Sequence, residues 1–261
     1  MTLLTGIIFV IVFVSVFLLL YLGSERSLKP FVLTENYRGL LQQYVGFYNA
    51  LYNEEKTEFE NRIQQFLSKV RITGVGTKVD DADRILIAAS AIIPIFAFKD
   101  WQYNNLHEVL LYPAAFPNNL SPTGPDGELY GGMVGWGDMQ NGMMLSQADL
   151  RAGFMYSHQG RNTAIHEFVH LIDKADGATD GIPESIMDQE FIIPWLALMH
   201  REIQKITEGQ SIIHPYGATN TAEFFAVAAE YFFGQPQALK TAHPELFQML
   251  EQIFKVTPKG S

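Results

Sequence analysis

The chain has 261 residues, of which 48% are hydrophobic and 18% are charged, so a full hydrophobic core is expected and disorder is not. The formal net charge of −10 argues against nucleic-acid binding, because that function needs a basic patch. The absence of cysteine excludes disulfides and fits a reducing compartment without proving one. No internal repeat is visible, and the length fits one compact domain behind an N-terminal segment.

The first predicted element is an apolar helix at the N-terminus. Residues 3–22 carry no charge, and a helix rising about 1.5 Å per residue would span a hydrocarbon core of roughly 30 Å there. A cleaved signal peptide is disfavoured because no Lys or Arg precedes the apolar run. Arg26, Lys29 and Arg38 follow it, and the positive-inside rule then places the remaining chain in the cytoplasm.

These observations predict a single-pass membrane protein whose domain lies in the cytoplasm. The predicted division is a transmembrane anchor at 1–24, a juxtamembrane linker at 25–34 and one folded domain at 35–261.

Three helices are expected in the first half of the domain. Residues 33–51 and 54–70 have the spacing of amphipathic helices. Residues 85–98 are uncharged but include Pro94, and the run is too short to span a membrane. It is better interpreted as a buried core helix with a kink, capped by Asp80 or its neighbour.

The middle of the chain favours turns and short strands. Residues 118–127 are rich in Gly, Pro, Asn and Ser, which is typical of a loop. Residues 130–145 alternate enough to predict one or two strands. Residues 142–146 form either an exposed edge that pairs with an extended peptide or an ordinary interior strand, and the sequence favours neither.

The segment His166-Glu167-Phe168-Val169-His170 carries the strongest chemical signal. It has the pattern H-E-x-x-H, which on a helix places two imidazoles on one face, where they can bind one zinc ion. Glu167 lies on an adjacent edge of that helix, where it can act as a general base toward water. Asn162 or Thr163 can cap the helix, and the apolar residues among the motif give it a side that packs into a core.

Three further helices are expected after the motif. They are predicted at 183–206, with an interruption near Pro194, at 219–233, and at 244–254.

A catalytic zinc usually has three protein ligands, and two candidates compete for the third position. Asp176 stands where an extended H-E-x-x-H motif ends, but Asp173 fills the position at which that motif has a turn-forming glycine. The other candidates are Glu223 and Glu230, seven residues apart in a strongly apolar helix, where a carboxylate is costly to bury unless it is paired or bound to metal. Glu223, near the helix start, is preferred.

Two blocks of sequence resemble the Mlc titration factor A family of zinc-dependent peptidases, whose catalytic region is similar to that of anthrax lethal factor. Residues 160–173 match a pattern near G-x-N-x-x-I-H-E-F-A-H-x-L-D. Residues 216–233 match a pattern near Y-A-x-x-x-x-x-E-x-F-A-V-x-S-E-Y-F-F. The resemblance covers roughly residues 35–255, and it departs from the pattern at Ala228.

The resemblance implies zinc held by His166, His170 and Glu223, with Glu167 as the base. It also implies that Tyr216 donates a hydrogen bond to the developing oxyanion, with His214 as a rival for that role. Val227 stands where a thermolysin-type enzyme has an Asp that supports a zinc histidine, so Asp173 is considered as a candidate partner instead.

The sequence therefore predicts an α+β, zincin-like metallopeptidase domain that binds one Zn²⁺ per chain and cleaves a peptide or protein substrate. The alternative is a zinc-containing protein that sequesters a transcriptional regulator, or another partner protein, without turnover.

Overall fold

The computed structural model describes residues 31–117, 129–136, 139–155 and 160–258. The N-terminal helices come first in this part of the chain: α2 (Glu35–Tyr44), α3 (Gly46–Ala50) and α4 (Asn53–Lys69). The helix expected at 33–51 is broken at Val45, which has an extended backbone and a side chain buried in the core. The helix expected at 54–70 is confirmed as α4.

A buried helix forms the centre of the N-terminal half. Helix α5 (Asp81–Ile92) begins with a capping box, in which Asp80 and Asp83 each accept a hydrogen bond from the other's backbone N–H. Pro94 lies in η1 (Ile93–Ile95), the short 3-10 helix that follows directly. The expected buried helix is confirmed, and it ends where proline removes a backbone donor.

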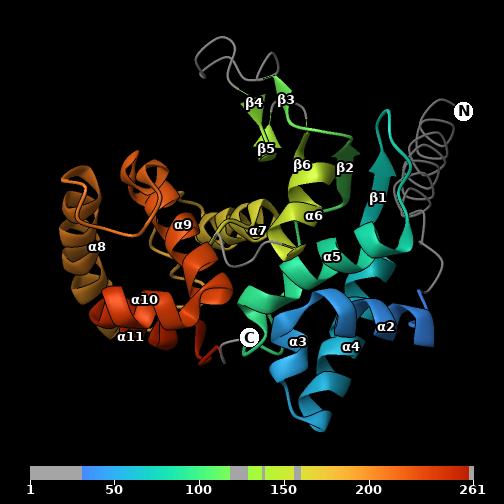
Figure 1. The fold of residues 1–261 in the computed structure, drawn as a ribbon, viewed down its shortest axis with the longest axis horizontal. Helices are drawn as coiled ribbons and strands as arrows, with labels where there is room; N and C mark the ends of the chain where they lie inside the picture. Colours follow the sequence, from blue (N-terminus) through green and yellow to red (C-terminus); the bar gives the residue numbers. More distant parts are fainter. Residues whose placement is uncertain (1–30, 118–128, 137–138, 156–159, 259–261) are drawn as a thin grey trace, which may run out of the picture. The chain divides into compact units, whose positions relative to one another are not determined.

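A small mixed sheet lies next to these helices (Figure 1). Its strand order is β1-β2-β6-β5, with parallel pairing except for the antiparallel pair of β5 and β6. A separate two-stranded sheet pairs β3 with β4. The strands are β1 (Arg71–Gly74), β2 (Glu108–Tyr112), β3 (Phe116–Pro117), β4 (Leu129–Tyr130), β5 (Gly132–Trp136) and β6 (Met139–Ser146).

The expectation of strands at 130–145 is confirmed, and the position of residues 142–146 is now settled. These residues belong to β6, which pairs with β2 on one side and β5 on the other. They form an interior strand, so an exposed edge there is the wrong alternative. In this sheet the edge next to β6 is β5.

The remaining elements are mostly helical. They are α6 (Gln147–Met155), α7 (Thr163–Asp173), η3 (Lys174–Asp176), η4 (Gln189–Phe191), α8 (Ile192–Thr207), η5 (Pro215–Ala218), α9 (Thr221–Gly234), α10 (Pro236–Ala242) and α11 (Pro244–Phe254). Pro194 lies in the first turn of α8, where its missing N–H does no harm, so it begins a helix rather than interrupting one.

Helix α7 lies between the sheet and the C-terminal helices (Figure 1). It contacts β5 and β6 of the sheet, α5 and α6 of the N-terminal half, and α9 of the C-terminal half. Its residues Ile165, Phe168, Val169 and Ile172 are buried in the core. The domain is therefore a helix-rich α+β structure in which α7 joins the two halves.

The helices of the described residues do not support the predicted membrane localisation. Among them, none is both long and apolar enough to cross a membrane. The longest, α4, has 17 residues with a polar composition, whereas a spanning helix needs about 20 apolar residues. This contradicts the prediction of a single-pass membrane protein with a cytoplasmic domain. Residues 3–22, on which the anchor prediction rested, lie outside the described residues.

Candidate metal centre

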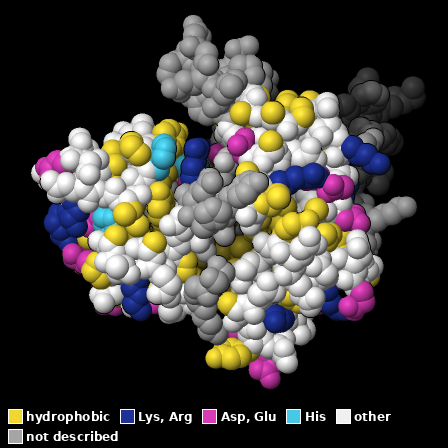
Figure 2. Space-filling model, viewed as in Figure 1, with side chains coloured by type: hydrophobic (Ala, Val, Ile, Leu, Met, Phe, Trp, Pro, Cys, Tyr) yellow, Lys and Arg dark blue, Asp and Glu magenta, His cyan; other side chains and the backbone are white. Residues whose placement is uncertain are grey.

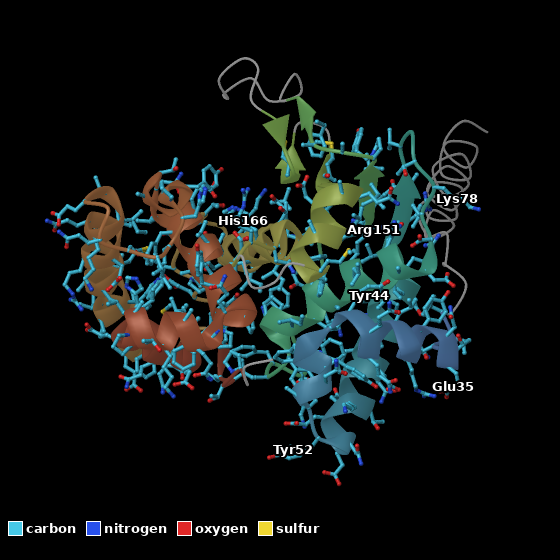
Figure 3. The ribbon with its side chains drawn as sticks, viewed as in Figure 1. Glu35, Tyr44, Tyr52, Lys78, Arg151 and His166 are labelled. Atoms are coloured by element: carbon cyan, nitrogen blue, oxygen red, sulfur yellow. The ribbon has the colours of Figure 1, made fainter. Side chains whose placement is uncertain are left out.

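Two capped helices carry the side chains of the site. The side chain of Asn162 accepts a hydrogen bond from the backbone N–H of Ile165 at 3.0 Å and so begins α7. The side chain of Asn220 accepts one from the N–H of Glu223 at 2.9 Å and begins α9. Because α7 and α9 pack against each other, the H-E-x-x-H motif faces the start of α9. Figure 3 shows His166 at this junction.

Three ligand atoms converge between these helices. Nε2 of His166 lies 3.0 Å from Nε2 of His170 and 3.0 Å from Oε2 of Glu223. Nε2 of His170 lies 3.4 Å from the same carboxylate oxygen. Among the described residues, these three form the group whose donor atoms could hold a metal ion, and we call them the ligand group. The structure thus brings together all three residues that the sequence assigned as ligands.

A second carboxylate, that of Glu230, contacts the other ring nitrogen of His166. Oε1 of Glu230 lies 2.8 Å from Nδ1 of His166, and Oε2 accepts a hydrogen bond from the backbone N–H of Asn162 at 2.5 Å. Glu230 is buried and seven residues after Glu223, so two turns of α9 supply both carboxylates. The sequence showed both glutamates on one face but did not show that Glu230 fixes the ring of His166.

Asp173 does not have the role considered for it. Both of its carboxylate oxygens lie 3.0 Å from the backbone N–H of Gly181, so it holds the loop that follows α7. Asp176, the alternative third ligand, accepts hydrogen bonds from the N–H groups of Ala178 and Glu184. Both aspartates are therefore used by the turn after the motif rather than by the ligand group.

Burial of Asp173 gives a prediction for stability. Burial raises the pKa of this carboxyl to about 6, whereas an unfolded chain titrates near about 3.9. Between these values the folded chain binds more protons, so the free energy of unfolding falls as the pH rises through this window. In wild type this fall in the free energy of unfolding is expected to be on the order of 1–2 kcal/mol after allowance for solvent screening. The side chain in Asp173→Asn cannot ionise, so the variant is expected to lack this fall.

The measurement is urea unfolding of metal-free wild type and Asp173→Asn at about pH 4.5 and about pH 7. The free energy of unfolding of Asp173→Asn, relative to that of wild type, is expected to be higher at about pH 7 than at about pH 4.5. The exposed Asp100→Asn is the control, because Asp100 is not among the charges that chiefly act on Asp173, and its stability difference from wild type is expected to stay constant between the two pH values. A difference that does not change with pH in Asp173→Asn would contradict this account.

Charges within the site act on one another. Burial alone would lower the pKa of His166, but the carboxylates of Glu223 and Glu230 outweigh it and raise that pKa well above its ordinary value. Burial acts to raise the pKa of Glu223, yet the hydrogen bonds from His166 and His170 hold it far below the ordinary value. Burial raises the pKa of Glu167, and the two histidines oppose it. The ligand carboxylate is thus kept ionised beside a carboxyl that can take up a proton.

Glu167 is buried on the side of α7 that faces the sheet. A Cβ built on Gly132 would lie 2.6 Å from Oε1 of Glu167 and 2.5 Å from its Cγ, which is closer than real Cβ contacts allow. Strand β5 can therefore approach the carboxylate only because residue 132 has no side chain. This close packing restricts the side chain of Glu167, which follows His166 directly in α7.

A cleft of about 890 Å³ opens over the ligand group. On one side it is lined by residues 131–134 at the start of β5, and on the other by His214, Tyr216 and Tyr231. Arg161 and Lys174 also line it, and Figure 2 shows basic side chains next to histidines on this face. His166, His170 and Glu223 are among the residues that line this cleft.

Tyr216 lies at the mouth of the cleft on η5. Its ring centroid is 6.1 Å from that of His166, and the residue is 43% exposed. The neighbouring His214 is the N-cap of η5, and its Nδ1 accepts a hydrogen bond from the N–H of Tyr216 at 3.2 Å. His214 therefore orders the turn that presents Tyr216, while the phenol is the group beside the ligand histidine.

The donor set fits a divalent metal ion. Two imidazole nitrogens and one carboxylate oxygen converge from two rigid helices, and the combination is one that zinc accepts. One histidine has its other ring nitrogen on a buried carboxylate, which is the usual support for a metal-bound histidine.

Comparisons with known proteins find relatives that match most of the chain. An uncharacterized protein of Synechocystis sp. is 29% identical over 90% of this chain and 88% of its own length. Mlc titration factor A of Escherichia fergusonii is 29% identical over 80% of this chain and 82% of its own length. The protein of the same name from Salmonella arizonae is 29% identical over 75% of this chain and 81% of its own length. The resemblance to this family is confirmed.

A family model described as glucose-regulated metallo-peptidase M90 matches residues 23–255, which include every residue of the site. The chain therefore belongs to the M90 metallo-peptidase family.

Proposed function

We propose that the protein is a zinc-dependent metallopeptidase of zincin-like fold that hydrolyses peptide bonds in its cleft. His166, His170 and Glu223 would hold one Zn²⁺, which supplies a Lewis acid and lowers the pKa of water toward about 7. The observation that carries this proposal is the convergence of three ligand atoms next to the buried Glu167. A metal site with only a structural purpose would not need a base at that position.

Glu167 would serve as general base and then as general acid. It takes a proton from the attacking water and passes it to the nitrogen of the leaving amine. Burial raises its pKa above the ordinary carboxyl value, and a raised pKa makes the carboxylate a better acceptor for the proton of water. The packing of Gly132 against it keeps the carboxylate oriented during both transfers.

Tyr216 would stabilise the oxyanion. A phenol donates a hydrogen bond to charge that exists only in the transition state, which raises kcat rather than substrate affinity. Its position on the cleft mouth beside His166 supports this role.

Strand β5 would bind the substrate backbone. It is the strand at the end of the sheet order, and its first residues line the cleft. An extended peptide can add to such an edge through main-chain hydrogen bonds, so recognition would depend on backbone more than on side chains.

The proposal is tested with a mixed peptide library and mass spectrometry. Zinc-loaded protein is expected to cleave peptides, chelation is expected to stop cleavage, and zinc is expected to restore it. Cleavage that continues unchanged after full removal of metal would contradict the proposal.

Glu230→Gln is expected to weaken zinc binding about 10- to 100-fold, because His166 loses the carboxylate that orients and polarises its ring. A competition titration against a chromogenic chelator measures this. Glu245→Gln, on the surface, is the matched control and is expected to bind zinc as wild type does. An unchanged zinc affinity in Glu230→Gln would show that this carboxylate does not support the site.

A second function is favoured by the names of the relatives. Several are called Mlc titration factor A, which points to the binding of a regulator by those proteins. For this chain the proposal is that a regulatory protein binds as a partner, in place of turnover or together with it. Pull-downs with wild type and with Glu167→Gln as baits separate the two cases. A partner that both baits retain indicates binding without turnover, and a partner enriched only by Glu167→Gln indicates a trapped substrate.

A further inference from the structure

A second buried polar cluster lies away from the metal centre, and the mechanism above does not use it. Nδ1 of His243 lies 2.6 Å from Oε2 of Glu202, and Nε2 of His243 lies 3.0 Å from the hydroxyl of Ser211. Glu202 and His243 are 1% and 4% exposed. Nζ of Lys205 donates to the other oxygen of Glu202 at 2.6 Å. We call Glu202, His243 and Ser211 the anchor network.

The anchor network ends on the segment that leads to Tyr216. The hydroxyl of Ser211 accepts a hydrogen bond from the backbone N–H of Ile213 at 3.1 Å, and the side chain of Ile213 is buried. His214 follows as the N-cap of η5, and its Nδ1 accepts a hydrogen bond from the N–H of Tyr216. Tyr216 comes two residues later in η5, so the segment before it is held through Ser211 by Glu202 of α8 and by His243 at the start of α11.

Stability alone does not account for such a cluster. Burying a carboxylate is costly because it loses its hydration, and apolar residues of the same size often give equal or greater stability. A buried network does define one geometry, because each hydrogen bond needs its partner at a set distance and angle. Here the geometry that it defines is that of the turn carrying a partly exposed tyrosine.

We infer that Ser211, His243 and Glu202 are positioning residues that hold Tyr216 over the ligand group. This inference rests on the oxyanion role proposed for Tyr216. None of the three touches the ligand group in the contacts described above, so they act through the backbone of residues 211–216. A short 3-10 turn has few internal hydrogen bonds, and its orientation depends on what fixes its ends.

The kinetic test is a double-mutant cycle between Ser211→Ala and Tyr216→Phe in the zinc-loaded, full-length protein. Ser211→Ala is expected to lower kcat about tenfold with little change in KM, because a misplaced donor acts on the transition state. In the Tyr216→Phe background the same change is expected to have less than about a twofold effect. Ser211→Thr, which keeps the hydroxyl, is expected to restore most of the rate.

Ser68→Ala is the matched control. Ser68 also accepts a backbone N–H, from Phe31 at 2.9 Å, but lies on α4 away from the cleft. Ser68→Ala is expected to lower Tm by about as much as Ser211→Ala does, while leaving kcat unchanged. A loss of kcat in Ser211→Ala that is equally large in both Tyr216 backgrounds would overturn the inference.

Hydrogen exchange tests the same inference without depending on turnover. Amides of residues 212–218 are expected to exchange at least about tenfold faster in Ser211→Ala than in wild type, and unchanged in Ser68→Ala. Unchanged exchange in Ser211→Ala would overturn the positioning role. A wild type that cleaves no peptide would instead refute the proposed function, and the exchange result would still decide whether the network fixes this turn.

Discussion

Glu167→Gln is expected to lower kcat for peptide hydrolysis by about 10²- to 10⁴-fold while the protein still binds zinc. The amide has the shape of the carboxylate but cannot take a proton from water. Glu167 is not one of the three residues whose ligand atoms converge, so metal affinity has no reason to fall. The loss should appear in kcat and in kcat/KM together, because the base acts only in the transition state.

The measurement combines steady-state kinetics on one fluorogenic peptide with metal analysis of the same sample. Glu184→Gln, at an exposed position in the loop after α7, is the control and is expected to retain full activity. Wild-type rates in Glu167→Gln would remove the general base from the account. Loss of zinc in that variant would instead mean that Glu167 helps to hold the metal.

Gly132→Ala is expected to lower kcat by about 10²-fold without a comparable loss of zinc. A methyl group at this position would overlap the side chain of Glu167, with contacts of 2.5–2.8 Å to its Cγ, Oε1 and carboxyl carbon. Either the strand or the carboxylate must move. Because the strand is held in register by β6, the side chain of Glu167 is expected to be displaced.

Two companion variants show whether the effect is specific. Gly39→Ala places the same methyl in open space on α2 and is expected to change neither kcat nor zinc content. In the double variant Gly132→Ala/Glu167→Gln, the alanine is expected to add little further loss, since both changes act on one group. Full wild-type activity in Gly132→Ala would show that Glu167 tolerates displacement.

The ligand group could be predicted from the sequence because its signals are local. The capping residues Asn162 and Asn220 fix the start of each helix, and the spacing of His166 and His170 then sets which side chains share a face. The apolar helix indicated that its carboxylates need partners, and Glu223 was preferred for its place near the helix start and in part for the family resemblance. The roles of Glu223 and Glu230 could not be separated in this way, because the two residues lie on the same face.

Other features depend on contacts distant in sequence and could not be predicted. The order of the sheet, with β6 inside and β5 at the edge, follows from pairing between strands that the chain connects through long segments. Gly132 meets Glu167 across 35 positions of sequence, so nothing local marks it. Asp173 has the spacing of a histidine partner but bonds to Gly181, because the turn after α7 brings that N–H close.

The most direct test of the metallopeptidase account is to titrate zinc into metal-free wild-type protein while following peptide hydrolysis, with Glu223→Ala measured in parallel. The account predicts a rate that rises in proportion to zinc and stops rising near about one equivalent per chain, and a variant that needs a large excess of zinc. A wild type that binds one zinc per chain and hydrolyses no peptide, or one that is active without metal, would contradict it.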